Sequence, residues 1–361
     1  MDTAMPYHMG ASEPFLGRAL GDGYRERVKV ATKLPPWSVK EPADMDRLLK
    51  LQLDFINTDH IDYYLVHSLS GGSWQTMYDM GVIDFLERAK KDGRVMNAGF
   101  SFHGDIDAFK IIVDAYDWAF CQIQYNYLDE HNQAGTEGLE YAAAKGLGII
   151  VMEPLRGGNL CGKIPAPAQA IWDEAEAKRS PAEWALRWVW NRPEVTLLLS
   201  GMNEEEHIDE NLRIADEGVA DSLTAKELAL VDRVKEVYQG LTKADCTGCR
   251  YCMPCQHGVK IPECFEVYNH RYMFDNAREG KFLYMMRVGA LFSGEELGYA
   301  SKCEECGECE EACPQGLPIQ SLMKEIADDF EGPGMKVLAW IIKRVMAVQR
   351  WRTMRQAKKT K

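Results

Sequence analysis

Short apolar runs alternate with amphipathic segments through the first half of the chain. Six of the runs are rich in β-branched residues and are bounded by polar or turn-forming positions, a pattern that predicts strands. The predicted strands are Val28–Lys33, Ile61–His67, Val95–Ser101, Ala119–Gln124, Gly148–Glu153 and Val195–Ser200. Between the first two strands, apolar residues recur at helical spacing on one face, which predicts a helix packed on a sheet. The residues of that face are Met45, Leu48, Leu49, Leu53 and Ile56.

The ends of the predicted strands recur at a constant interval, with 34 residues from Lys33 to His67 and 34 more from His67 to Ser101. Repetition of one strand and one helix predicts a parallel sheet with crossover helices. We therefore predict an α/β fold, a (β/α)8 TIM barrel that is N-terminally incomplete in this chain. A doubly wound sheet is the alternative, although no G-x-G-x-x-G motif follows the first strand.

Helix signals continue after the fifth predicted strand. Ser180 suits an N-cap, Pro181 suits the first helical position, and Glu183 suits a capping box. Polar segments with helical spacing at 204–216 and 224–239 then end the barrel, which we assign to residues 1–241.

Eight of the eleven cysteines lie in two short runs that follow the barrel. Such runs predict two [4Fe–4S] clusters, because each cluster takes four cysteine ligands and the fourth cysteine of one run can reach the other cluster. Structural zinc sites and disulfides are the alternatives. We assign residues 242–330 to a small, mainly helical ferredoxin-like domain. The ligands are Cys246, Cys249, Cys252, Cys255, Cys303, Cys306, Cys309 and Cys313.

The residues after the two runs repeat one another. Cys255-Gln-His-Gly-Val-Lys-Ile aligns with Cys313-Pro-Gln-Gly-Leu-Pro-Ile, which makes Cys255 equivalent to Cys313 and leaves Cys264 as a spare thiol.

Charge divides the chain into an acidic body and a basic end. The net charge is −13, and the nine Lys and Arg residues after Glu331, with no Asp or Glu among them, leave −22 on the rest. An acidic body disfavours nucleic acid as a partner. No apolar stretch is long enough to span a membrane, and the N-terminus does not resemble a signal peptide. Together with the cluster cysteines, this predicts a location in a reducing cytoplasm.

The basic segment at 331–361 begins with a Glu-Gly-Pro-Gly break and continues with apolar residues at helical spacing, including Leu338, Ile341 and Val345. Two interpretations remain open. In the first, the segment is an amphipathic helix that binds either anionic lipid or an acidic redox partner. In the second, it is a helix docked on the acidic body of the same chain.

Four residues occupy positions where a barrel of this kind places its chemistry, at the strand ends and in the loops that follow them: Asp2, Tyr7, Lys33 and His67. With Asp-Thr-Ala-x-x-Tyr, Ala-Thr-Lys, Val-His and Gly-Phe-Ser, the chain resembles the aldo-keto reductase family. With the Met152-Glu-Pro-Leu-Arg-Gly-Gly motif and the cysteine runs, it resembles the branch that carries a C-terminal ferredoxin-type domain.

The resemblance implies reduction of a small carbonyl compound by NADH or NADPH. Hydride transfer leaves an alkoxide that must receive a proton, and a free tyrosine is a weak acid at neutral pH. A neighbouring ammonium favours the tyrosinate and so promotes donation. Tyr7 would then be the proton donor, Lys33 the ammonium, Asp2 its counterion, and His67 a hydrogen-bond donor to the substrate oxygen.

The same resemblance implies cofactor contacts. Ser101 and Gln122 would bind the nicotinamide carboxamide, and Met152 replaces an aromatic residue that stacks on the nicotinamide in many members. Asn211 would bind the adenine end. Gly201 and His207 stand where members that prefer NADPH carry Lys and Arg, so the resemblance does not predict a strong NADPH preference.

The resemblance begins partway through a complete barrel, because Asp2, the second residue of this chain, already corresponds to a catalytic residue of the family. The first strand, the first helix and most of the second strand of a complete barrel are missing ahead of it. We therefore expect the native protein to begin roughly 40 to 50 residues upstream.

Two functions fit these observations. One is an NAD(P)H-dependent reductase of an aldehyde or ketone whose clusters serve as an electron input or have a structural role. The other is an electron-transfer protein that uses a non-catalytic barrel as a docking platform for a one-electron redox partner.

Overall fold

The computed structural model describes residues 1–246, 248–291 and 297–358. By compactness they form two units. The first comprises residues 1–162, 175–231 and the chain from Arg350, and the second comprises 163–174 and the described part of 232–349. None of the described helices is both long and apolar enough to cross a membrane.

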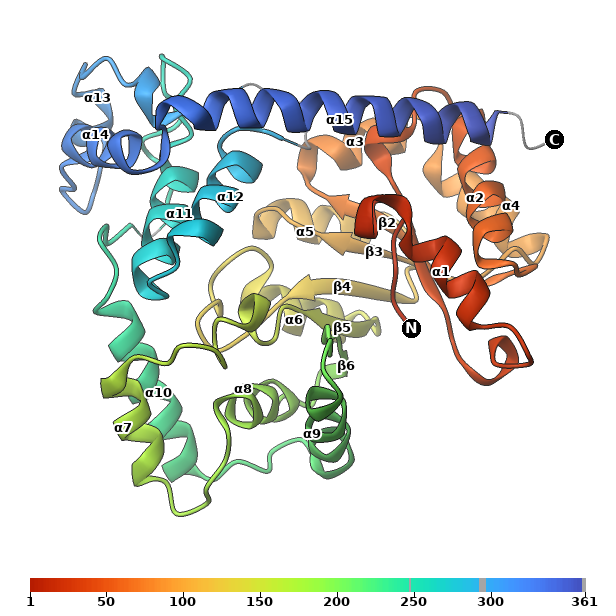
Figure 1. Cartoon of the computed structure of the whole chain (residues 1–361), viewed down its shortest axis with the longest axis horizontal. Helices are drawn as coiled ribbons and strands as arrows, with labels where there is room; N and C mark the ends of the chain where they lie inside the picture. Colours follow the sequence, from red (N-terminus) through yellow and green to blue (C-terminus); the bar gives the residue numbers. More distant parts are fainter. Residues whose placement is uncertain (247, 292–296, 359–361) are drawn as a thin grey trace. The chain divides into compact units, whose positions relative to one another are not determined.

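A six-stranded parallel sheet forms the centre of the first unit (Figure 1). Neighbouring strands are also consecutive in sequence, from β1 to β6. This order agrees with the predicted barrel topology, because a doubly wound sheet reverses its strand order partway. The strands are β1 Ala31–Leu34, β2 Ile61–Leu69, β3 Val95–Phe102, β4 Phe120–Gln124, β5 Gly148–Met152 and β6 Val195–Leu198.

Helices follow the strands as the apolar periodicity predicts. The helix α2 covers Ala43–Ile56, and all five residues of its predicted apolar face are buried. Burial of each such side chain stabilises the fold by about 1.5 to 3 kcal/mol relative to exposure. The other helices of this unit include α1 Ser12–Ala19, α3 Gly71–Asp79, α4 Val82–Lys91, α5 Ile106–Asp114, α6 Gly135–Ala144, α8 Pro181–Trp190 and α9 Glu205–Glu217.

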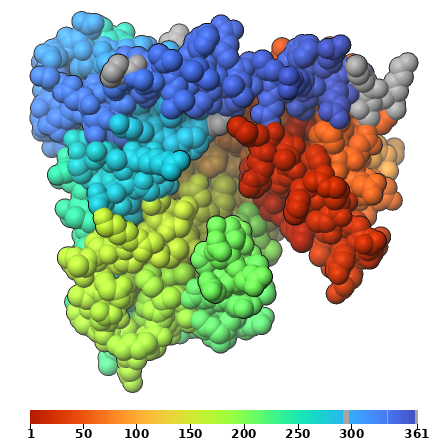
Figure 2. All heavy atoms as spheres, viewed as in Figure 1, coloured from red at the N-terminus to blue at the C-terminus, as the bar shows by residue number. Residues whose placement is uncertain are grey.

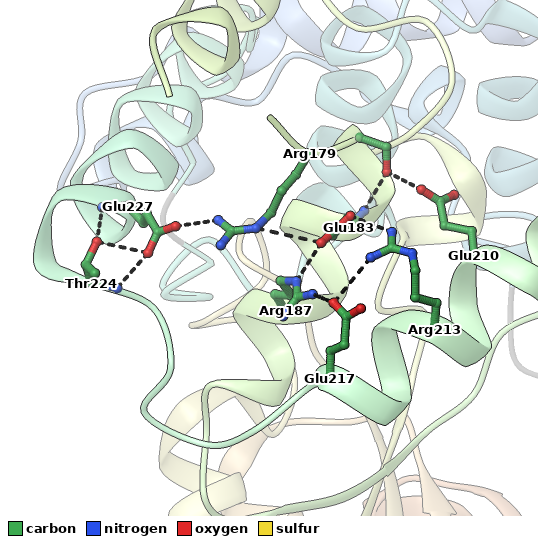
Figure 3. Close-up of polar contacts among 9 residues, drawn as sticks. Arg179, Glu183, Arg187, Glu210, Arg213, Glu217, Thr224 and Glu227 are labelled. Carbon is green, nitrogen blue, oxygen red and sulfur yellow. Dashed lines mark hydrogen bonds and ion pairs between the residues drawn. The ribbon is translucent and has the colours of Figure 1, made fainter. Parts of the chain in front are cut away.

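The start of α8 confirms one part of its predicted cap and corrects another. Ser180 Oγ accepts a hydrogen bond from the backbone N–H of Glu183 at 2.9 Å, and Pro181 opens the helix. The side chain of Glu183 does not close a capping box. Its buried carboxylate instead accepts from Arg187 and Arg213, each at 2.7 Å (Figure 3). Two guanidinium groups outcompete one backbone N–H because charge-assisted hydrogen bonds are stronger.

This ion-pair network holds α9 against α8. Burial raises the pKa of the Glu183 carboxyl, but Arg213 and Arg187 bring it below its ordinary value, so the group stays ionised. Ser180 Oγ also donates to Glu210 at 2.6 Å, and Arg187 pairs with Glu217 (Figure 3). The network therefore fixes the helix that carries two of the predicted cofactor residues.

The second unit is built from helices around an aromatic core. Tyr284 stacks on Phe330 with ring centroids 4.8 Å apart, and its hydroxyl accepts from the backbone N–H of Ala300 at 2.8 Å. The segment 163–174 belongs to this unit rather than to the first, and Glu174 pairs there with Arg233 at 2.8 Å. The helices are α7 Ala166–Glu174, α11 Ile261–Met273, α12 Ala277–Arg287, α13 Glu308–Glu311 and α14 Ile319–Phe330. Two more, α10 Ala225–Gln239 and α15 Pro333–Ala357, have residues in both units.

Candidate active site and cysteine cavities

Lys33 lies at the centre of a cluster formed by three of the predicted catalytic residues. It points from β1, and its side chain is almost fully buried. Its Nζ donates to Asp2 Oδ2 at 2.6 Å, to the carbonyl oxygen of Thr3 at 2.8 Å and to Tyr7 Oη at 3.3 Å. These three contacts use all the donors of an ammonium.

The local backbone explains how the N-terminal residues reach β1. Asp2 forms an isolated parallel bridge with Ala31, which places its carboxylate beside the strand that carries Lys33. The chain then turns into the 3-10 segment η1 (Tyr7–Gly10). The contact with the Thr3 carbonyl was missed by the sequence analysis, since a backbone acceptor leaves no side-chain signal.

Tyr7 combines a fixed oxygen with access to solvent. Its side chain is 39% exposed, and the Lys33 ammonium lies 4.8 Å from the centre of its ring. Because the Lys33 ammonium donates to the phenolic oxygen, the hydroxyl proton of Tyr7 is left to donate elsewhere.

His67 lies on the next strand, β2, beside Tyr7. Its ring centroid is 6.1 Å from that of Tyr7 in an edge orientation and 5.0 Å from that of Trp37. Burial, followed by the charges of Lys33 and His103, holds the pKa of His67 well below its usual range. The ring is therefore neutral near pH 7 and carries one N–H donor. Trp37 was not predicted, and only its position just after the first strand could have suggested it.

Two predicted cofactor residues adjoin this cluster. Ser101 on β3 and Gln122 on β4 are direct neighbours in the sheet register, and both are buried. Gln122 Nε2 donates to Asp2 Oδ1 at 3.3 Å. Ser101 Oγ accepts from the backbone N–H of Ser68 at 2.7 Å, which leaves its own hydroxyl proton to donate.

The remaining predicted cofactor residues lie on β5 and beyond β6. Met152 is half-buried at the end of β5. Asn211 on α9 donates to Ser200 Oγ at 3.0 Å, which joins that helix to the end of β6. Gly201 and His207 are exposed, and a Cβ added at Gly201 would meet no atom within 4 Å. No described contact joins Gly201 or His207 to the Lys33 cluster.

A buried acid beside the strand ends was also missed by the sequence analysis. Asp129 accepts from Gln124 Nε2 at 2.9 Å and from Asn126 Nδ2 at 2.8 Å, and Arg156 lies 3.5 Å away. Burial raises the pKa of Asp129, but Arg156 and the amides hold it below its ordinary value. The ion pair of Asp129 with Arg156 joins the loop after β4 to the Met152-Glu-Pro-Leu-Arg motif after β5. In the sequence, only the presence of Arg156 in that motif could have indicated this pair.

The eight cluster cysteines surround two cavities in the second unit. The first cysteine cavity is lined by Cys246, Cys249, Cys252 and Cys313. The second cysteine cavity is lined by Cys255, Cys303, Cys306 and Cys309, and Cys252 also reaches it. Each cavity thus combines three cysteines of one run with the fourth cysteine of the other run, as the predicted crossing requires.

The backbone of the two runs repeats along with their sequence. Cys255 O accepts from the N–H of Gly258 at 2.9 Å, and Cys313 O accepts from the N–H of Gly316 at 3.1 Å. Both glycines have positive φ, of 71° and 61°, which a glycine adopts without strain. The helices α11 and α14 then begin at equivalent isoleucines. This geometry supports the equivalence of Cys255 and Cys313.

The donor set of the cavities fits polynuclear iron–sulfur clusters. All eleven cysteines are free thiols, and no three His, Cys, Asp or Glu side chains of the described residues converge on a point that would hold one metal ion. Burial and then the charges of Cys303 and Cys306 raise the pKa of Cys309 to about 11, so a positively charged group in the cavity is needed to keep this thiol as a thiolate near pH 7. Cys264 lies in the apolar core and lines neither cavity.

Known proteins resemble both parts of the chain. Residues 1–236 match the aldo/keto reductase family, and residues 245–317 match the 4Fe-4S dicluster domain. The NADH-specific methylglyoxal reductase of Escherichia coli is 23% identical over 269 residues, which cover 62% of this chain and 80% of that protein.

Solved structures share the fold of the first unit. The holo form of an aldo-keto reductase from Bacillus halodurans gives a TM-score of 0.54 at 23% identity and covers 65% of this chain and 81% of that one. An aldo-keto reductase from Klebsiella pneumoniae in complex with NADPH gives a TM-score of 0.51 at 24% identity, with 65% and 78% covered. These similarities confirm the predicted barrel-type fold.

Proposed function

The chain belongs to the aldo/keto reductase family, and on this basis we propose that it reduces an aldehyde or a ketone by hydride transfer from a nicotinamide cofactor to the carbonyl carbon. The observation that carries the proposal is the three-way contact of Lys33 with Asp2, Thr3 and Tyr7. A barrel that served only as a docking platform would not need a buried ammonium directed at a solvent-accessible phenol.

The residues divide the chemistry among themselves. Tyr7 would donate its proton to the substrate oxygen, and a bound nicotinamide would supply the hydride to the carbonyl carbon. Lys33 stabilises the tyrosinate that forms, and Asp2 balances the charge of Lys33. Neutral His67 donates a hydrogen bond to the same substrate oxygen, which favours the developing alkoxide. The buried pair Ser101 and Gln122 orients the carboxamide of the cofactor.

The direct test follows an isotope. NADH deuterated at C4 is incubated with the protein and a panel of aldehydes and ketones, and the product alcohols are analysed by mass spectrometry. We expect one deuterium on the carbinol carbon of at least one product. Cofactor binding without deuterium transfer to any member of a broad panel would instead support the electron-transfer alternative.

We expect NADH to bind at least as tightly as NADPH. A 2′-phosphate needs basic partners, whereas this chain offers exposed Gly201 and His207 beside the carboxylates of Glu204, Glu205 and Glu206. The Escherichia coli relative is named as NADH-specific and the Klebsiella structure contains NADPH, so both choices occur among similar proteins. Fluorescence titration measures both dissociation constants, and a tenfold preference for NADPH would refute this expectation.

A matched variant tests the cause of the preference. Gly201→Lys combined with His207→Arg should tighten NADPH binding by about tenfold or more and leave NADH within a few-fold, because the new charges meet only the 2′-phosphate. The substitution at Gly201 is accommodated, since a Cβ added there meets no atom within 4 Å.

We assign two [4Fe–4S] clusters to the two cysteine cavities. A cluster passes one electron at a time, whereas a nicotinamide delivers two as hydride. We therefore propose that the clusters either exchange electrons with an external one-electron redox protein or stabilise the second unit.

A further inference from the structure

The helix α15 has two different faces. Met335 and Ala339 on one face are buried in the core of the second unit with Ile319, Met323 and Phe330. Beyond them, Ala357 is again fully buried near the end of the helix. Their spacing of four and eighteen residues keeps all three on one side of an α-helix. Within the second unit, this face of the helix packs on the core of that unit.

The opposite face presents large apolar side chains to solvent. Val337, Ile341, Val348 and Trp351 follow one another at intervals of four, seven and three residues, which places them in a single stripe along the helix. We call the exposed apolar residues on this side of the helix the outer face of α15. Its exposed apolar residues are Val337 at 59%, Leu338 at 48%, Trp340 at 59%, Ile341 at 45%, Val345 at 50%, Val348 at 49% and Trp351 at 58%. The dark blue atoms of α15 lie at the surface in the view of Figure 2.

Basic residues accompany the apolar ones, and acidic residues do not. Arg344 lies 5.3 Å from the centre of the Trp340 ring, and Arg355 lies 5.2 Å from that of Trp351. Arg352 is exposed on the same side of the helix. No Asp or Glu occurs after Glu331. The outer face thus carries positive charge on a protein whose net charge is −13.

We propose that the outer face of α15 binds the surface of an anionic lipid membrane, with the helix lying flat in the headgroup region. A helix of this length extends about 37 Å, enough to bury the whole stripe along one plane. Tryptophans beside guanidinium groups suit the interface between headgroups and acyl chains, where an apolar ring and a charge are both solvated.

The apolar residues favour a membrane over an acidic protein as the partner. The acidic charge of a protein partner would account for the arginines but not for the long exposed row of Val, Leu, Ile and Trp side chains. Insertion into a lipid interface uses both kinds of residue, since burial of the apolar side chains supplies affinity and each Lys or Arg near an anionic surface adds to it. The proposal goes beyond the reductase function and does not depend on it.

The test uses the full chain, anaerobically reconstituted with iron and sulfide, and sedimentation with vesicles. We expect binding to vesicles of equimolar phosphatidylcholine and phosphatidylglycerol, at least tenfold weaker binding to phosphatidylcholine alone, and loss of binding as salt rises. Equal binding to both vesicle types would overturn the anionic part of the proposal, and binding to neither would overturn the proposal. If the protein bound an acidic protein but neither type of vesicle, the outer face of α15 would be assigned to that protein partner and the membrane proposal would be overturned.

Matched variants separate the outer face from a general effect of charge. Ile341→Glu with Val345→Glu should reduce vesicle binding by tenfold or more, whereas Ile111→Glu with Val219→Glu adds the same charge at exposed apolar sites elsewhere and should not. Arg344→Gln with Arg352→Gln should weaken binding more than Lys91→Gln with Lys226→Gln, since both control lysines are exposed outside α15. Unchanged iron content and melting temperature confirm that each variant is folded. Equal loss in the variants and their controls would overturn the assignment to this face.

Discussion

Replacing Tyr7 by Phe lowers the turnover of any carbonyl substrate by two or more orders of magnitude, because the change removes the proton donor and little else. The phenyl ring keeps the contact with Lys33, whose Nζ lies 4.8 Å from its centre, and the edge contact with His67. Cofactor binding should therefore stay within a few-fold. Steady-state kinetics and a fluorescence titration with NADH measure the two quantities separately.

Tyr78→Phe is the matched control for this variant. Tyr78 is 51% exposed on α3, and it lies outside the Lys33 cluster. The control should retain full turnover. If Tyr7→Phe also retained the turnover of the unmodified protein, the assignment of Tyr7 as proton donor would be wrong.

Exchanging one crossing cysteine removes a whole cluster. Reconstituted protein should contain about eight irons per chain, and Cys255→Ser or Cys313→Ser should each reduce this to about four. Cys264→Ser should retain the full content, because this thiol is buried in the apolar core and lines neither cavity. Iron and sulfide analysis under anaerobic conditions gives the result.

Double variants test the crossing itself. Cys249 and Cys313 line the same cavity, so Cys249→Ser with Cys313→Ser should lose one cluster only. Cys255 lines the other cavity, so Cys249→Ser with Cys255→Ser should lose both. If each run held its own cluster, the two results would be exchanged, and the pairing inferred from the cavities would be refuted.

The strand pattern could be predicted because burial on both faces of a parallel sheet requires nearly continuous apolar runs. All six predicted strands overlap observed ones, and the apolar face of α2 is buried in full. The failed prediction at Glu183 has a different origin. Its position matches a capping box, but Arg213 is 30 residues away in sequence, and local spacing gives no information about such a partner.

In the candidate site, too, some features could be predicted from the sequence and others depend on segments that are distant in the sequence. Asp2, Tyr7, Lys33 and His67 were predicted from their positions near strand ends and from the family resemblance, and the structure brings Asp2 and Tyr7 into contact with Lys33. The contact of Lys33 with the Thr3 carbonyl, the pairing of Trp37 with His67 and the buried Asp129 were not predicted. Backbone acceptors, ring packing and desolvation exist only once distant segments have met.

What the sequence by itself determined is the set of local patterns: the strand and helix periods, the cysteine spacing with its internal repeat, and the charge of the C-terminal segment. These depend on neighbours within a few turns of the chain. The tertiary structure decided whether the cysteines cross between the cavities as the sequence had predicted, and which side of α15 stays in solvent. Both depend on which segments exclude water from one another, and the sequence pattern of α15 is compatible with either face being buried.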